Sequence, residues 1–481
     1  MQKQNPLVYT VSLILLLGYG IYLFFRITLI PITHDEAGTI LNFSTQPVWD
    51  IVTFKDPVPN NHIFHTLLVK ALTTVFGYDE FICRLPNFIG GLIYWIFGFL
   101  LLRKINKGHL AWVLAGLVFL LGNPYLIEFF GLARGYGLSI AWMMVSIYLL
   151  MQGGHRYLYL SLLVAGLGVY TNLTTLNFFI PLCVLIFTML LDQKETRKPG
   201  LIIPIVIFIL VIASVGLPVS KMVSTDQFQF WGSNGFYSDT FLGLLRSSLM
   251  GKKYFGAATF EIFQALIIIV SLLVGYGTLR IVKRNRKKAL HIPAFQLGFL
   301  FFATLIYNIA QNMIFKIPFL NARTALLFYP LFVLASYSMF LKLNKPVSWK
   351  ISLIVPILGI ALWHIKTCFN MNSTYEWWFD ADNKKVMQAI SAAPKPEKPN
   401  EKISLKCNWL FQPSLTYYTK IDYSEVVAEP PYNKSIDTSE IVDYYYITSE
   451  DRNDWFERNY SVYQAYAWDS RFLMKKNKPY Q

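Results

Sequence analysis

The sequence predicts a polytopic α-helical membrane protein that ends in a small α/β domain, and three observations support this fold class. Hydrophobic residues form 54% of the 481 residues and charged residues only 15%, whereas about a quarter of the residues are charged in soluble domains. Apolar runs long enough for a membrane-spanning helix, which needs ~20 residues, recur from Val8 to Ile365. From about Met371 onward the chain is polar and rich in Tyr and Trp.

About eleven spans are expected from these apolar runs. The first extends from Val8 to Ile30; it is too long for the core of a signal peptide, and no small-residue cleavage site follows it. The stretch from Leu158 to Leu191 would be ~51 Å long as one helix, which exceeds a ~30 Å hydrocarbon core, so it is expected to turn at Tyr170-Thr171-Asn172. The other spans are expected at residues 85–102, 110–126, 136–151, 201–219, 260–281, 295–314, 320–341 and 349–365.

Clusters of Lys and Arg give the expected orientation in the membrane. They follow spans two, four, six, eight and ten, as in Arg103-Lys104 and in the run from Lys283 to Lys288, and such loops are cytoplasmic by the positive-inside rule. The N-terminus is then cytoplasmic. Residues 31–80 are extracytoplasmic, and so is the C-terminal region, because the number of spans is odd. Much of the net charge of +15 is therefore a topology signal, and nucleic acid is not expected as a partner.

Residues 367–481 are expected to form a separate extracytoplasmic α/β domain after a transmembrane domain of residues 1–366. A helix-like segment from Lys384 to Ile390 alternates there with strand-like segments at residues 403–410, 444–448 and 462–466, and residues 394–399 are typical of a Pro-rich surface loop. No catalytic motif is recognisable in this domain, so a structural or acceptor-positioning role is expected. The spacing of the four cysteines predicts no zinc site; Cys368 and Cys407 could pair if the domain is extracytoplasmic.

The loop of residues 31–80 contains the main candidate for chemistry, the adjacent carboxylates Asp35 and Glu36. Asp35 could simply cap a short helix over residues 37–46, or its carboxylate could accept a proton from an attacking hydroxyl. Arg134 and Arg323, at the outer ends of the fourth and tenth spans, could be membrane anchors or could hold phosphate oxygens through the planar guanidinium. A substrate with both a phosphate and a lipid tail would explain carboxylates and arginines gathered at one membrane surface.

Several short motifs follow one another along the chain. They are His34-Asp35-Glu36, Asn60-Asn61-His62, Phe81-Ile82-Cys83-Arg84-Leu85-Pro86, Ala133-Arg134-Gly135-Tyr136, and Asn321-Ala322-Arg323 with Phe328-Tyr329-Pro330. Over about residues 8–366, this succession resembles the GT-C glycosyltransferases, in particular the dolichyl-phosphate-mannose–protein mannosyltransferase-like superfamily, which includes the aminoarabinose transferases of lipid A. One segment departs from the pattern, because some relatives have His-Pro-Pro or Lys-Pro-Pro where this chain has Asn61-His62-Ile63-Phe64.

The resemblance implies that a sugar passes from a polyprenyl-phosphate donor to an acceptor on the extracytoplasmic face of a bacterial inner membrane. It implies Asp35 as general base in an inverting transfer, with Glu36 assisting in acceptor binding or in positioning a metal. The residues that it suggests for the donor phosphate are Arg134, Arg323, Lys70 and Arg84, and those for positioning donor or acceptor are His34, Asn61, His62 and Tyr136. Glu36 and His62 could also hold a divalent metal, although two histidines on one loop are more often simple hydrogen-bonding groups.

Two other classes of function compete with this hypothesis. A transporter or flippase of lipid-linked glycans would also need many helices and phosphate-binding arginines, but transporters tend to show internal repeats and ionisable groups at the bilayer midplane. A non-catalytic scaffold would leave the Asp35 loop unexplained. Release of polyprenyl phosphate from a labelled donor would separate the three classes. The sequence fixes neither the sugar nor the acceptor, which could be protein, lipid A, polysaccharide or another lipid-linked glycan.

Overall fold

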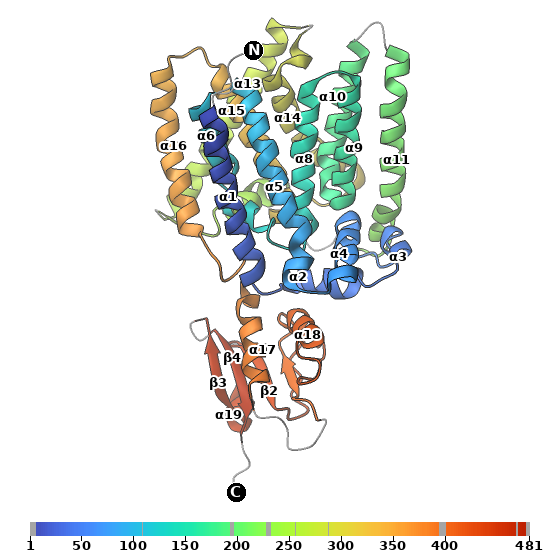
Figure 1. The fold of residues 1–481 in the computed structure, drawn as a ribbon, viewed down its shortest axis with the longest axis vertical. Coiled ribbons are helices and arrows are strands. Elements are labelled where there is room, and N and C mark those ends of the chain that lie inside the picture. Colours follow the sequence, from blue (N-terminus) through green and yellow to red (C-terminus); the bar gives the residue numbers. More distant parts are fainter. Residues whose placement is uncertain are drawn as a thin grey trace. The chain divides into compact units, whose positions relative to one another are not determined.

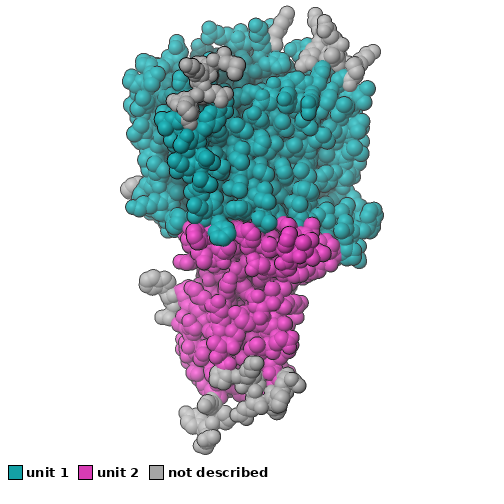
Figure 2. All heavy atoms as spheres, in the orientation of Figure 1, with its two compact units in different colours: residues 1–24, 47–68, 85–369 teal, residues 25–46, 69–84, 370–481 magenta. Residues whose placement is uncertain are grey.

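The computed structural model describes residues 6–107, 109–192, 197–227, 232–254, 256–286, 288–393, 401–467 and 470–477. The chain forms two compact units (Figure 2), each built from segments that are far apart in the sequence. Unit 1 comprises residues 1–24, 47–68 and 85–369, and unit 2 comprises residues 25–46, 69–84 and 370–481. The predicted domain boundary near residue 366 stays a prediction; the first compact unit ends close to it, at Phe369, but unit 2 also takes in two N-terminal segments.

Unit 1 is a bundle of apolar helices (Figure 1). Its long helices are α1 (Pro6–Leu29) as far as residue 24, α5 (Glu80–Ile105) from residue 85, α8 (Gly135–Gln152), α10 (Leu176–Asp192), α11 (Arg197–Ser224), α13 (Ala257–Arg284), α14 (Pro293–Phe315), α15 (Phe328–Lys342) and α16 (Val347–Cys368). Within the described residues, nine helices are long and apolar enough to cross a membrane; the spans of α10 and α15 include the 3-10 turns that precede them and cover Leu173–Asp192 and Ala322–Lys342. The predicted class of polytopic helical membrane protein is therefore confirmed.

Two of the expected spans are too short, so the predicted number of eleven is not confirmed. Helix α6 (Leu110–Leu120) has 11 residues and α9 (His155–Thr171) has 17, which corresponds to ~16 Å and ~26 Å against a ~30 Å core. Helix α6 ends before Asn123, whose side chain caps the short helix α7 (Pro124–Glu128). The expected turn at residues 170–172 is confirmed, because Asn172 ends α9 and caps the 3-10 turn that precedes α10.

Burial divides the helices of unit 1 into an inner and an outer set. Helix α8 is buried along almost its whole length and packs against α9, while α10 packs against α14. By contrast, α11 and α13 expose large apolar side chains, for example Leu210 at 62% and Leu272 at 68%. Apolar surface of this extent on a soluble protein would be unstable, and on a membrane protein it faces lipid tails.

Short elements connect the long helices around the segment that contains Asp35. They are α2 (His34–Ala37), the π-helix η1 (Gly38–Phe43), α3 (Val48–Val52) and α4 (Ile63–Phe76). Thr33, and not Asp35, is the N-cap of α2, and Glu36 completes a capping box with it. The alternative that Asp35 caps a helix over residues 37–46 is therefore wrong, because the helix begins one turn earlier than the sequence suggested.

The C-terminal part of unit 2 is a four-stranded sheet with helices beside it (Figure 1). The elements are α17 (Asn383–Ser391), β1 (Leu405–Cys407), α18 (Gln412–Ile421), β2 (Tyr444–Thr448), α19 (Asp454–Asn459), β3 (Tyr460–Tyr466) and β4 (Arg471–Lys476). The strand order is β1-β2-β4-β3; β1 and β2 are parallel and the other pairs antiparallel.

The predicted small α/β region is confirmed, with three elements that the sequence pattern did not indicate, β4, α18 and α19. Tyr445, Phe456 and Met474 are central to its core. The expected loop at residues 394–399 lies outside the described residues. Cys368 and Cys407 are both free, buried thiols, so the structure contains no disulfide between them.

Candidate active site

In unit 2, the turn that contains the two adjacent carboxylates is built around a buried ion pair. Glu36 is fully buried, and so is Arg84 at the start of α5. Arg84 Nε donates to Glu36 Oε1 at 2.7 Å and Arg84 Nη2 donates to Glu36 Oε2 at 2.7 Å. Glu36 Oε2 also accepts the backbone N–H of Thr33 at 2.9 Å. The pair therefore ties the first turn of α2 to α5.

Arg84 has no donor left for a second partner. A guanidinium has five N–H donors, and Glu36 takes two of those of Arg84. The other three are given to backbone carbonyls: Nη1 donates to Ile27 at 3.1 Å and to Ile30 at 2.6 Å, and Nη2 donates to Pro31 at 2.8 Å. The prediction that Arg84 binds the donor phosphate thus conflicts with its geometry, which gives it a structural role.

The same pair bears on the expected metal. Both carboxylate oxygens of Glu36 face a guanidinium, so this side chain does not fit the role of a metal ligand. Among the described residues, no group of three or more His, Cys, Asp or Glu side chains could hold a metal ion.

Asp35 lies one residue before Glu36 and is half-buried. On its other side, the backbone N–H of His34 donates to Asp380 Oδ2 at 2.7 Å. His34 Nδ1 donates to the carbonyl of Leu410 at 2.9 Å, and its ring packs edge-on against Trp409 with centroids 5.9 Å apart. The side chain of His34 is thereby fixed next to Asp35.

Two further groups of unit 2 complete the surroundings of this turn. Lys70 Nζ donates to the carbonyl of Ser44, beyond the π-helix, at 3.1 Å. Burial raises the pKa of Asp380 well above its usual range, and the negative charges of Asp35 and Glu36 act in the same direction. Asp380 was missed by sequence reasoning, because it lies in a tryptophan-rich stretch without any motif.

In unit 1, the structure brings together four of the predicted site residues. The ring of His62 packs edge-on against Tyr136 with centroids 5.2 Å apart, and the guanidinium of Arg134 lies 5.8 Å from the centroid of the same tyrosine. Burial lowers the pKa of His62 well below its usual range. The charges of Arg134, His65 and Arg323 lower the pKa of His62 further. A neutral imidazole thus lies within the field of two guanidiniums from separate segments.

His62 has unused hydrogen-bonding capacity at this position. Its side chain is 5% exposed, and its Nε2 atom has no hydrogen-bond partner. A buried polar atom without a partner costs about 1–3 kcal/mol. Such an atom is typical of a position where a ligand supplies the missing partner.

The bend that carries Arg134 is fixed by α5 and by close packing. Asn87 Nδ2 donates to the carbonyls of Leu132 and Arg134, and Asn87 Oδ1 accepts the backbone N–H of Leu138 at 2.9 Å. Gly135 follows, where a Cβ would overlap a backbone carbonyl and come within 2.9 Å of the His62 side chain. Sequence reasoning missed Asn87, although it lies directly after the Arg84-Leu85-Pro86 motif.

Asn61, predicted to position a substrate, is buried and makes a local contact. Its Nδ2 atom donates to the carbonyl of Ile51 at 3.1 Å, which joins the loop before α4 to α3. Lys221 of α11 adds a second tie to this loop, since its Nζ donates to the carbonyl of Thr53 at 2.7 Å. These contacts hold the segment that leads to His62.

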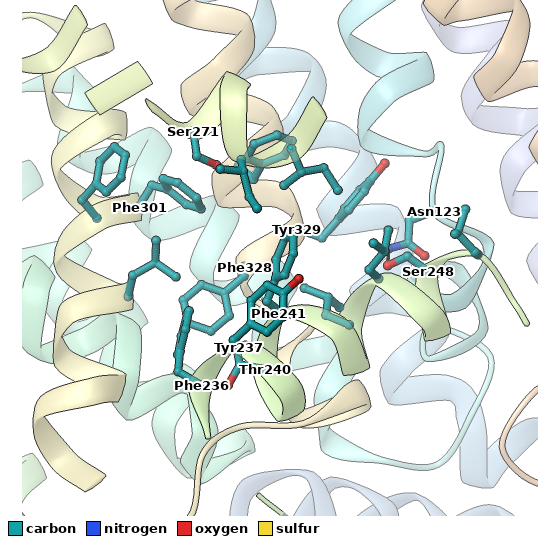
Figure 3. Close-up of a pocket in the computed structure, with 18 of the residues that line it drawn as sticks. Asn123, Phe236, Tyr237, Thr240, Phe241, Ser248, Ser271, Phe301, Phe328 and Tyr329 are labelled. Atoms are coloured by element: carbon teal, nitrogen blue, oxygen red, sulfur yellow. Dashed lines mark hydrogen bonds between the residues drawn. The ribbon is translucent and has the colours of Figure 1, made fainter. Parts of the chain in front are cut away.

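Unit 1 also contains an apolar cavity of about 440 Å³ (Figure 3). Aromatic side chains dominate its lining, and Asn123, Ser248 and His364 are its main polar groups. The apolar lining residues are Phe236, Tyr237, Phe241, Leu244, Leu245, Leu249, Ile267, Ile268, Leu272, Phe301, Phe302, Leu305, Phe328, Tyr329 and Phe332. Because the side chain of Leu272 is largely exposed on α13, one wall of the cavity belongs to the outer surface of the bundle.

The cavity adjoins the segment that contains Arg323. Thr240, in the π-helix η3 (Phe236–Phe241), donates to the carbonyl of Leu320 at 2.6 Å. Arg323 lies in the 3-10 turn η5 (Ala322–Ala325), five residues before the cavity residue Phe328. An apolar chamber and a candidate phosphate ligand therefore belong to one continuous part of unit 1.

The fold can be compared with solved structures. A crystal structure of ArnT from Cupriavidus metallidurans bound to undecaprenyl phosphate matches with a TM-score of 0.52 and 12% identity, over 97% of this chain and 97% of that one. The apo structure of the same protein matches with a TM-score of 0.51 and 12% identity, over 97% and 98%.

The chain has an ArnT-like fold. ArnT is a GT-C protein, so the GT-C fold expected from the sequence motifs is confirmed. No family model matches the sequence, and neither does any curated protein. The ArnT-like fold thus rests on the arrangement of the chain in space, at an identity too low to detect by sequence comparison.

Proposed function

We propose that this protein is a membrane glycosyltransferase that moves a sugar from a polyprenyl-phosphate donor to an acceptor. The observation that carries the proposal is the group formed by Arg134, Arg323 and the buried His62, in the same unit as a large apolar cavity. The ArnT-like fold supports it, because one of the ArnT structures is bound to undecaprenyl phosphate.

The donor would be held by two different kinds of contact. Arg134 and Arg323 supply positive charge and planar pairs of donors for the phosphate oxygens. His62 adds an N–H donor without adding charge, since its imidazole is neutral. The first isoprene units of the lipid tail would fill the aromatic cavity, entering past Leu272 from the lipid-facing surface of α13. Lys70 remains a further candidate for the phosphate.

The reaction would be a direct displacement at the anomeric carbon. The acceptor hydroxyl forms the new C–O bond while the bond to the phosphate oxygen breaks, and polyprenyl phosphate leaves with the electron pair. Asp35 would take the hydroxyl proton. Of the two adjacent carboxylates, only Asp35 is proposed as the base, because Glu36 is fully engaged by Arg84 and Thr33. A single displacement inverts the anomeric configuration.

The donor site is tested by binding of undecaprenyl phosphate to purified protein. Arg134→Ala and Arg323→Ala should each weaken binding about ten- to a hundredfold, the value of a charge-assisted hydrogen bond of ~1.5–3 kcal/mol. Replacement by lysine should restore binding only in part, since lysine lacks the bidentate geometry. Arg103→Ala is a charge-matched control, because Arg103 lies over the ring of Tyr9 at the far end of α5. Equal affinity in all variants would contradict the proposal.

The base is tested by turnover. With an undecaprenyl phosphate that carries a labelled sugar, Asp35→Asn should reduce release of undecaprenyl phosphate by ~10²–10⁴-fold, the usual contribution of a general base, while lipid binding is retained. NMR of the product should show inversion. Near-normal turnover of Asp35→Asn, or a retained configuration, would contradict the mechanism. Binding without any release in the wild type would instead favour the transporter alternative.

The proposed orientation has the N-terminus in the cytoplasm, and Asp35 and the C-terminal sheet on the extracytoplasmic side of a bacterial inner membrane. The acceptor, a glycan, a lipid or a protein, would therefore be modified on that side. On intact cells, a cysteine in place of the exposed Lys434 should react with an impermeant maleimide, and one in place of the exposed Lys283 should not. The reverse pattern would contradict this orientation.

A further inference from the structure

Within unit 2, residues from the C-terminal part of the chain hold the backbone on both sides of Thr33. The backbone N–H of Ile32 donates to the hydroxyl of Tyr418 at 2.9 Å, and Ser414 Oγ donates to the carbonyl of Ile32 at 2.6 Å. Both of these side chains belong to α18. The backbone N–H of His34 donates to Asp380 Oδ2 at 2.7 Å. The turn that contains Asp35 is therefore built by side chains more than three hundred residues away.

Asp380 accepts a backbone N–H group of α2 that has no partner within the helix. His34 is the first residue of α2, and N–H groups in the first turn of a helix have no partner within the helix. Glu36 satisfies the N–H of Thr33, and Asp380 satisfies that of His34. A carboxyl oxygen at 2.7 Å is a suitable acceptor for such a group. Asp380 is 1% exposed, so no water can take over this role without rearrangement.

Asp380 is itself held in place by the sheet. It lies in the 3-10 turn η6 (Trp378–Asp382), and its Oδ1 atom accepts Nδ2 of Asn383 at 2.8 Å. Arg471 of β4 donates to the carbonyl of Trp378 at 2.9 Å and to Oδ2 of Asp382 at 2.7 Å. A chain of contacts thus runs from β4 through η6 to the first N–H of α2.

We propose that Asp380 is a positioning residue for Asp35, which fixes the first turn of α2 so that the base points at the acceptor hydroxyl. This inference rests on the proposed function of Asp35. It gives the C-terminal sheet an indirect role in the reaction, because β4 holds η6 and η6 contains Asp380. A displacement of about 1 Å in a catalytic group can cost about a hundredfold in rate. Loss of the hold on His34 should therefore reduce turnover while leaving the donor site unchanged.

Two variants separate positioning from a general loss of structure. Asp380→Ala removes the acceptor, so kcat should fall about ten- to a hundredfold at unchanged affinity for undecaprenyl phosphate. Asp380→Asn should retain most of the turnover, because its amide oxygen can still accept the N–H of His34. Asn383 can then rotate its amide toward the new NH₂ group, since its Oδ1 atom has no partner in the present arrangement.

Asp443→Ala is the matched control. Asp443 also uses its carboxylate to accept a backbone N–H in unit 2, that of Ser404 at 2.8 Å, but this contact lies at the beginning of β1 and not on the turn. Asp443→Ala should leave kcat near the wild-type value. A fall in kcat as large as that of Asp380→Ala would indicate a general effect on unit 2 and would overturn the proposal.

Hydrogen–deuterium exchange gives a readout that does not depend on glycosyl transfer. In Asp380→Ala, peptides that cover residues 31–40 should exchange faster than in the wild type, and in Asp443→Ala they should not. The positioning role would be overturned if Asp380→Ala showed the exchange and turnover of the wild type. It would also be overturned if Asp380→Asn were as impaired as Asp380→Ala. If Asp35→Asn turns over normally, the proposed base fails, while the exchange experiment still decides whether Asp380 holds the turn.

Discussion

The buried pair of Glu36 and Arg84 makes a strong prediction about stability. Glu36→Gln keeps the shape of the side chain but removes its charge, and one of the two new terminal atoms is an NH₂ group that faces N–H donors of Arg84. An uncompensated guanidinium then remains at a site with no solvent exposure. Breaking such a pair typically costs about 3–5 kcal/mol. At about 2–4 °C per kcal/mol for a unit of this size, the unfolding temperature should fall by roughly 6–20 °C.

The measurement should report on unit 2 specifically. Cys407 is buried in β1, so the temperature at which its thiol becomes reactive follows unfolding of this unit in detergent. Replacing both partners, Glu36→Met with Arg84→Met, should cost less than the sum of the single changes, because no buried charge then remains. An unfolding temperature of Glu36→Gln within about 2 °C of the wild type, less than 1 kcal/mol on this scale, would refute the reasoning. It would return Glu36 to the list of candidate catalytic groups.

Three further predictions concern unit 1. As pH falls from 7 to 5, the unfolded chain protonates His62 and His65 while burial keeps the folded imidazoles neutral. The free energy of unfolding should therefore fall by about 2 kcal/mol per histidine. In the double variant His62→Gln/His65→Gln, this part of the decrease in unfolding temperature with falling pH should be absent. Gly135→Ala should weaken undecaprenyl phosphate binding, whereas Gly216→Ala, with open space around it, should not. Ser271→Trp, which fills the cavity, should weaken binding of undecaprenyl phosphate more than that of a ten-carbon prenyl phosphate; equal losses would exclude the cavity as the tail site.

The fold class could be predicted from the sequence because the lipid-facing helices have to be apolar along their whole length. Helices such as α11 and α13 show this in composition alone. The number of spans could not be predicted in the same way, since helix ends depend on local caps. Asn123 starts α7 within an apolar run and so shortens the third expected span to the 11 residues of α6. Hydropathy does not detect this feature.

For the candidate site, too, part could be predicted from the sequence and part could not. Residue type and order led to Asp35, His62 and the arginines at positions 134 and 323 as candidates, and their roles stay proposals. Burial and contacts in the structure decided which candidates are structural. The sequence does not show whether a carboxylate or an arginine binds substrate or pairs with another side chain, as Glu36 and Arg84 pair with each other. Asp380 could not be found, since it contacts His34 across 346 residues of sequence and no local pattern records such a pairing.

Unit 2 is built from N-terminal and C-terminal segments of the chain, and this has a consequence for its folding during synthesis. The ribosome delivers residues 25–46 early, but their partners Asp380, Ser414 and Tyr418 emerge only near the end of synthesis. At about 5–20 residues per second, the 346 residues that separate His34 from Asp380 take roughly 17–70 s to translate. During that interval the amide of His34 has no carboxylate to bind. Unit 2 would therefore be complete only once its C-terminal segment has been made, so a truncated or stalled chain would contain Asp35 without the contacts that order its turn.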